Sequence, residues 1–190
     1  MSLSPRLRKL SLTAHLLSSI GWIGAVAGFL ALSIAGLTSR DPETVRSAYL
    51  AMDLTTRWVI VPFALASLLT GLVSSLGTWW GLARHYWVLL KLVLTIPSTI
   101  LLLVHTQAIG YVANAASKMA LSGADLGKQR LQLVFDAGAG ILVLLVVTAL
   151  SVYKPRGQTR YGRRKQRERR LLQRQRALSR LHDHKAVSQP

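Results

Sequence analysis

Four long apolar runs decide what this chain can fold into. They cover about residues 10–37, 58–79, 86–112 and 131–153. A bilayer hydrocarbon core is about 30 Å thick and needs roughly 20 apolar helical residues to cross it, so each run is long enough. The runs also lack the period-two alternation of membrane strands. The sequence therefore predicts an all-α fold: a four-helix transmembrane bundle, antiparallel and up-down, within residues 10–153.

The ends of the runs carry helix signals. The first run follows basic residues, as a secretory signal does, but it is about twice as long as a signal core, so we expect a retained span. Asp41-Pro42-Glu43 predicts a helix start that leads into the second span. Pro62 and Pro97 fall inside the second and third spans, where proline is expected to kink a helix.

The basic residues are distributed unevenly along the chain. The sequence has 24 Lys and Arg against 7 Asp and Glu, and 13 of the 24 lie in residues 154–190. An apolar body with a basic tail excludes both an ordinary soluble enzyme and a disordered chain. In the predicted topology, 18 Lys and Arg fall on the side of the two termini and 6 on the other. The positive-inside rule then places the N-terminus (1–9) and the tail (154–190) in the cytoplasm, with the spans in the cytoplasmic membrane.

Small and polar residues predict how the spans pack. Gly24 and Gly28 form a small-xxx-small pair with Gly21 one turn earlier, and residues 137–140 read Ala-Gly-Ala-Gly, so close backbone contacts are expected there. Polar residues fall on one stripe of each of the first three spans. Hydroxyl-mediated helix packing is one interpretation of these stripes, and a polar track for protons or a small solute is the other.

Ionisable residues within spans are costly and therefore indicate sites. Toward the outer side, His105, Asp136 and Arg57 form an expected cluster, in which Asp136 pairs with Arg57 or with protonated His105. Toward the inner side lie three cationic or titratable residues: His15, His85 and Lys91. This inner group contains no acid, so an anionic ligand such as a propionate or a lipid phosphate would supply the missing charge. Alternatively, Lys91 reaches the inner surface and His15 is bonded to a neighbouring helix.

A haem site is one hypothesis for the inner group. His15 would ligate haem b, His85 would be its partner, and Lys91 would hold a propionate. His15 and His105 differ in depth by roughly 20 Å, too far for two ligands of one iron. We find no spacing typical of a metal site, no phosphate loop, and no catalytic motif, so no catalytic residue is assigned.

Three segments carry a resemblance to a known family. They are His15 with Trp22-Ile23-Gly24, residues 80–87 (WGLARHYW) and residues 151–157 (SVYKPRG). They resemble a family of uncharacterised, predicted four-span integral membrane proteins of actinobacteria, over roughly residues 5–165. The resemblance implies four spans and an inner-membrane location, and it implies no activity.

A looser likeness is to the copper-resistance D-type and protoporphyrinogen-oxidase J-type membrane proteins. It rests on a His seven residues before a Trp, as in His15 and Trp22, and on Trp87 four residues before Lys91. The J-type proteins bind haem, so this likeness implies a haem-binding redox protein. The chain departs from the rest of their histidine and arginine pattern.

The basic tail is expected to contact the membrane surface. Residues 154–190 carry a net charge of +11, with a thin apolar edge of leucines on a helix expected from about Gln166 to Leu181. Such a segment is typically drawn to anionic lipid headgroups. The tail has a single aromatic residue, Tyr161, which provides little stacking for bases, so no specific nucleic-acid binding is expected.

For the function of the protein, we favour a non-enzymatic membrane protein: an accessory, scaffold or small-solute permeation component. The alternative is the haem-binding redox protein, and a homo-oligomer stays open.

Overall fold

Helices account for every element in the part of the chain that the structure describes. The structure is a computed structural model, which describes residues 4–76, 86–118 and 124–153, with 163–164, 167–168 and 170–175 in the tail. The elements are α1 (Pro5–Thr38), α2 (Pro42–Thr55), a π-helical turn η1 (Thr56–Ile60), α3 (Val61–Leu76), α5 (Tyr86–Ser117) and α6 (Ala124–Tyr153). Four helices, with α2, η1 and α3 continuous, are long and apolar enough to cross a membrane. The predicted all-α four-helix bundle is therefore confirmed.

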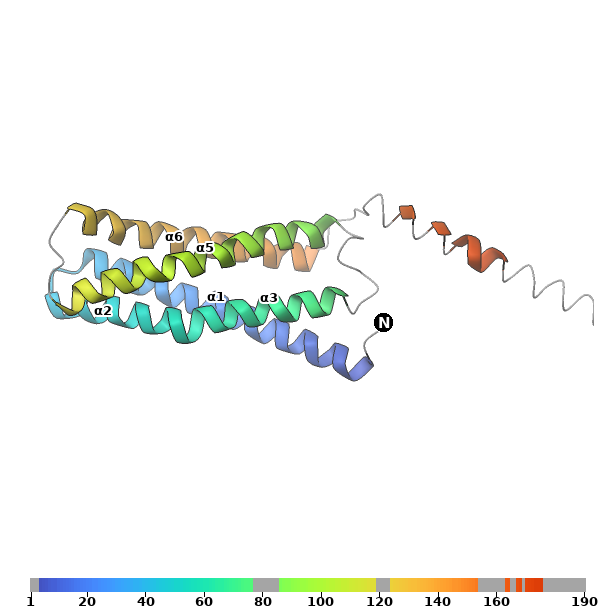
Figure 1. The fold of residues 1–190 in the computed structure, drawn as a ribbon, viewed down its shortest axis with the longest axis horizontal. Coiled ribbons are helices and arrows are strands. Elements are labelled where there is room, and N and C mark those ends of the chain that lie inside the picture. Colours follow the sequence, from blue (N-terminus) through green and yellow to red (C-terminus); the bar gives the residue numbers. More distant parts are fainter. Residues whose placement is uncertain are drawn as a thin grey trace, which may run out of the picture.

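The helices run antiparallel along one long axis (Figure 1). The end of α1, the start of α2, the end of α5 and the start of α6 lie at one end, which we call the loop end. The start of α1, the end of α3, the start of α5 and the end of α6 lie at the other, which we call the terminal end. Helix α1 packs on α2, η1, α3 and α6, whereas α5 packs on α2, α3 and α6.

The helices extend beyond the apolar runs, and mostly at the loop end. Helix α2 begins at Pro42, some 16 residues before the run that starts at Trp58, and α6 begins at Ala124 rather than near Leu131. The side chain of Asp41 caps α2 by accepting hydrogen bonds from the backbone N–H groups of Glu43 and Thr44. The predicted end of the second span, residues 77–79, lies outside the described residues.

The two prolines are accommodated differently. Pro62 lies two residues after the end of the π-helical turn Thr56–Ile60. Because proline has no N–H and clashes with the carbonyl four residues earlier, a widened turn just before it relieves the conflict. Pro97 lies inside α5, which remains one α-helix from Tyr86 to Ser117.

Packing is tightest toward the loop end. The largest fully buried side chains are Tyr49, Met52, Thr56, Ser33 and Val112, and all belong to that half of the bundle. Arg130 of α6 ties three helices together there. Its Nε donates to the Tyr49 hydroxyl at 2.9 Å, and its Nη2 donates to the carbonyl of Gly36 in the last turn of α1. The guanidinium carbon also lies 5.5 Å from the centre of the Tyr49 ring.

Only part of the small-residue prediction is confirmed. A Cβ added to Gly24, Gly28 or Gly138 would meet nothing within 4 Å, so the expectation for these three positions is wrong. Gly21 does make the predicted close contact, because an added Cβ there would lie 2.9 Å from the Phe63 ring. At Gly36, which the pattern did not indicate, an added Cβ would lie as close to the Tyr49 ring, at 2.9 Å. Helix α1 is apolar on all sides, so a small residue alone does not reveal which side meets a neighbour.

Candidate functional site

A histidine and a carboxylate meet within the spans. His105 of α5 and Asp136 of α6 approach to 3.1 Å between Nε2 and Oδ2. His105 is 12 residues before the end of α5 at Ser117, which places it about 18 Å along the helix from the loop end. Asp136 is 12 residues after the start of α6, at the same distance. Of the two partners expected for Asp136, the structure therefore provides His105.

Both ring nitrogens of His105 have partners. Nδ1 lies 2.9 Å from the carbonyl oxygen of Leu101, to which it donates. Nε2 lies 3.2 Å from the side-chain amide nitrogen of Gln132 and 3.1 Å from Oδ2 of Asp136. It accepts from Gln132 when it carries no proton, and it faces the carboxylate as a cation when it carries one.

The approach of the carboxylate to the ring is not a directed hydrogen bond. Oδ2 of Asp136 is buried and accepts no hydrogen bond from the described residues, although Nε2 of His105 lies 3.1 Å away, which is an ion-pair distance when the imidazole is protonated. The Asp136 side chain as a whole is 36% exposed. A buried carboxylate oxygen without a hydrogen-bond donor is costly, which indicates a position where a donor can bind.

His105 and Asp136 lie on the wall of a central cavity of about 170 Å³. Helices α1, α5 and α6 and the π-helical turn η1 all contribute to its lining, which is mostly aliphatic. Two buried aromatic side chains, Trp22 and Phe29, come from α1. The other polar residues on the wall are Thr56 and Ser98, whose hydroxyls donate to the carbonyls of Met52 and Leu94 in their own helices.

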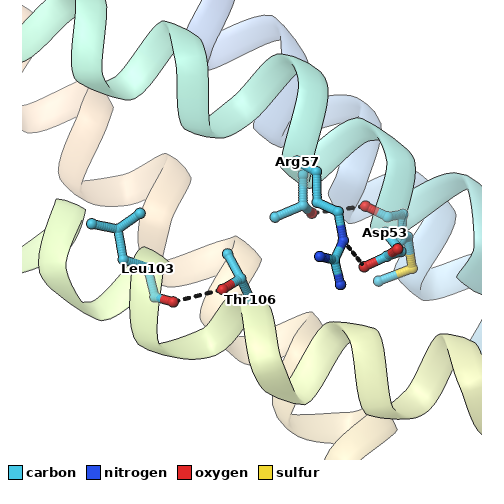
Figure 2. A network of polar contacts seen from close by, with 6 residues as sticks. Asp53, Arg57, Leu103 and Thr106 are labelled. Carbon is cyan, nitrogen blue, oxygen red and sulfur yellow. Dashed lines mark hydrogen bonds and ion pairs between the residues drawn. The ribbon is translucent and has the colours of Figure 1, made fainter.

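Arg57 is not part of this pair. Its Nε donates to Asp53 at 2.8 Å, one helical turn earlier (Figure 2). The Arg57 side chain extends toward α5 (Figure 2), and a Cβ added to Gly110 would lie 2.8 Å from its Nη2. Expecting Arg57 to pair with Asp136 was therefore wrong. The nearer acid at helical spacing takes the guanidinium, and the i, i+4 pattern in the sequence contains that signal.

The inner residues form a polar seam between α1 and α3. Nδ1 of His15 lies 3.0 Å from the carbonyl oxygen of Ser67 and 3.3 Å from the Thr70 hydroxyl. On either side of it along the seam, hydroxyl pairs join Ser11 to Ser74 and Ser19 to Ser67, each at 2.8 Å. The predicted bonding of His15 to a neighbouring helix is thus confirmed, and the stripes of the first two spans face each other as packing contacts.

Lys91 lies near this seam, on α5. It is close enough to His15 for its charge to act on the imidazole. Its Nζ also lies 5.7 Å from the centre of the Trp87 ring, a cation–π distance. The described residues place no carboxylate beside it. His85, the expected partner of His15, lies outside the described residues.

The haem hypothesis gains little from this geometry. Nδ1 of His15 donates to a backbone carbonyl, as it does in many metal-bound histidines. However, the ring packs against Gly71, where an added Cβ would lie 3.0 Å from Cε1, and His15 does not line the central cavity. Within the described residues, no group of three His, Cys, Asp or Glu could hold a metal ion.

Gln132 is the site residue that the sequence reasoning missed. It lies four residues before Asp136 on α6, so helical spacing alone puts the two side chains on one face. The cavity could not be predicted from residue spacing, because it depends on how side chains from four elements fill the space between them.

Comparison with models of known protein families, with curated protein sequences and with solved structures yields no match in any of the three.

Proposed function

We propose that this protein is a non-enzymatic component of the cytoplasmic membrane that binds a small, largely apolar molecule in its central cavity. The single observation that carries the proposal is the cavity at bilayer depth, bounded by three of the four spans and the π-helical turn of the remaining one. Within the classes expected from the sequence, this favours a small-solute permeation or binding component over a scaffold.

The size and lining of the cavity support a ligand of benzene scale. Apolar cavities of about 150 Å³ hold benzene or xenon, and this one is about 170 Å³. Small-molecule sites typically combine an apolar lining with a few polar groups that fix orientation. Here the apolar part includes Trp22 and Phe29, and the polar groups are Thr56, Ser98, His105 and Asp136.

The proposed orientation has both termini in the cytoplasm. The first residues of α1 and the last residues of α6 lie at the same end of the bundle (Figure 1), so they share one side of the membrane. The excess of Lys and Arg on that side, 18 against 6, supports the cytoplasm. A reporter that is active only outside the cytoplasm, fused to either terminus, is expected to stay inactive.

The tail is proposed to contact anionic lipid. Its described residues are helical, and Leu171 and Leu172 are exposed beside exposed arginines. Attraction of such a basic segment to the inner leaflet is worth about 1 kcal/mol per Lys or Arg near the surface. A peptide of residues 158–185 is expected to bind anionic vesicles and to dissociate as salt rises, whereas equal binding to neutral vesicles would contradict this mechanism.

Binding of a small apolar probe tests the cavity directly. ¹⁹F NMR of 4-fluorotoluene with protein in a non-ionic detergent is expected to show a bound resonance. Gly140 lines the cavity, and a Cβ added there would lie 3.7 Å from Val26, so Gly140→Leu places its side chain in the cavity and should remove that resonance. Gly138→Leu is the matched control, because an added Cβ there meets nothing within 4 Å.

The two variants differ only in which side of α6 carries the new side chain. A bound resonance that survives Gly140→Leu, or none in the wild-type protein, would contradict the proposal. An absorption spectrum of protein from haem-replete cells tests the haem alternative. A Soret band that weakens in His15→Ala would support haem binding instead.

A further inference from the structure

We propose that the ligand of the central cavity is a small organic cation, a protonated amine with an apolar body, whose ammonium group binds Asp136. This inference rests on the proposed function, because it names the class of ligand for the same cavity. The argument comes from the hydrogen-bonding capacity that the cavity wall has left.

Three polar side chains on the wall have acceptor capacity remaining. The hydroxyls of Thr56 and Ser98 already donate to carbonyls of their own helices, so they offer lone pairs alone. Asp136 as a carboxylate can only accept. The indole N–H of Trp22 is a donor on the same wall. A ligand that matches Thr56, Ser98 and Asp136 must donate hydrogen bonds, and an ammonium group has donors and no acceptor.

The charge balance points the same way. Asp136 is a carboxylate within a span, where an uncompensated charge is costly, and its Oδ2 accepts no hydrogen bond from the described residues. The cations on the same half of the bundle are engaged elsewhere: Arg57 by Asp53, and Arg130 by Tyr49 and Gly36. His105 lies 3.1 Å from Oδ2 of Asp136 and offsets its charge only when the imidazole is protonated. An ammonium group on the ligand would neutralise the carboxylate beside an unprotonated imidazole.

The rest of the wall accommodates the body of such a ligand. Trp22 and Phe29 line the cavity and are 4% and 6% exposed, respectively. An aromatic face attracts an ammonium group, and it also packs against the apolar part of a ligand. An inorganic cation would find one carboxylate and a mostly aliphatic wall, which is a poor substitute for its oxygen ligands. An amine that carries a ring or a short alkyl chain uses both parts of the site.

The test compares matched probes that differ in the ammonium group. Dissociation constants of 4-fluorobenzylamine and 4-fluorotoluene are measured by ¹⁹F NMR in the same non-ionic detergent, with wild-type protein and with Asp136→Asn. We expect the substitution to weaken the amine by about tenfold or more, the scale of a charge-assisted hydrogen bond, and 4-fluorotoluene by less than about threefold. Because each probe is compared with itself, its partitioning into detergent cancels.

The controls separate failure of this inference from failure of the proposed function. Glu43→Gln removes a carboxylate at the start of α2, outside the cavity, and is expected to leave both constants unchanged. Equal weakening of both probes in Asp136→Asn, or none of either, would overturn the amine inference while the cavity stands. No bound resonance for either probe in the wild-type protein would overturn the proposed function itself.

A measurement on the wild-type protein alone keeps the inference falsifiable if Asp136→Asn does not fold. The cavity is expected to bind 4-fluorobenzylamine and to reject 4-fluorobenzoate, which has the same ring and the opposite charge. Binding of the benzoate with equal affinity would refute the role of Asp136 as the anionic partner.

Discussion

The Tyr49 hydroxyl links α2 to α6 at the loop end. Tyr49 is 1% exposed, and its hydroxyl accepts from Arg130 of α6. Removing the hydroxyl leaves a guanidinium N–H without its partner in a packed interface, and such an unsatisfied group costs about 1–3 kcal/mol.

We therefore expect Tyr49→Phe to lower the free energy of unfolding by about 1–3 kcal/mol. The measurement is denaturation by SDS in mixed micelles. Tyr153→Phe, at a side chain that is 83% exposed, serves as the control and should leave the unfolding midpoint unchanged. Equal midpoints for the two variants would show that the Arg130 contact contributes nothing.

Among single residues, spacing identified some partners and not others. His105 and Asp136 could be paired from their similar depths in two adjacent spans, and the structure brings them to 3.1 Å. Arg57 was one of the two partners expected for Asp136, and it pairs instead with Asp53, because that acid lies one helical turn away at i, i+4. Gln132 was overlooked because an uncharged amide does not stand out in an apolar helix.

At the scale of the element, the last turn of α1 packs more tightly than the turn around Gly28. A Cβ at Gly36 would lie 2.9 Å from the buried Tyr49 ring, which Arg130 keeps in place, whereas one at Gly28 meets nothing within 4 Å. Gly36→Ala is expected to be less stable than Gly28→Ala by about 1–3 kcal/mol, the usual cost of overpacking. Unfolding midpoints of the two variants in the same micelles measure the difference, and equal midpoints would contradict the tight contact.

The start of α2 should respond to acid. The hydrogen bond from the Thr44 side chain, with those from the backbone N–H groups of Thr44 and Glu43, holds the pKa of Asp41 below its usual range. A lowered pKa means that the carboxylate stabilises the folded cap. This stabilisation is present above the ordinary pKa of aspartate and is lost as pH falls through the lowered value.

Amide hydrogen exchange at Thr44 measures this effect. Protection in the wild-type protein is expected to fall as pH drops through the lowered pKa of Asp41. Asp41→Asn should keep its protection, since asparagine caps a helix without titrating in this range. Parallel pH profiles for the two proteins would contradict a role for the carboxylate.

The helices were largely predictable because the cost of burying an unpaired backbone in lipid forces each long apolar run into a helix. The residues at which the helices begin and end were less predictable. Helix α6 begins at Ala124, seven residues before the apolar run at Leu131, because Arg130 gains partners on α1 and α2 by extending the helix past the membrane core. The π-helical turn before Pro62 is a local adjustment that no hydropathy pattern signals.

At the scale of the whole molecule, the four apolar runs predict a bundle and its up-down order, but they do not predict the cavity inside it. A cavity forms where side chains from separate helices fail to fill the space between them, and each helix alone appears equally apolar. The polar seam of α1 and α3 and the Arg130 contact hold the two ends of the bundle, and the cavity lies where neither reaches.

Photolabelling in lipid vesicles tests most directly whether ligands occupy this cavity. The probe is a short alkyl-diazirine amine, and the labelled positions are mapped by mass spectrometry. We expect adducts at Asp136 and on the α1 segment around Trp22, suppressed by excess benzylamine and by Gly140→Leu but not by Gly138→Leu. Labels confined to outward-facing positions such as Phe135, which is 68% exposed, with no competition by benzylamine, would contradict the account.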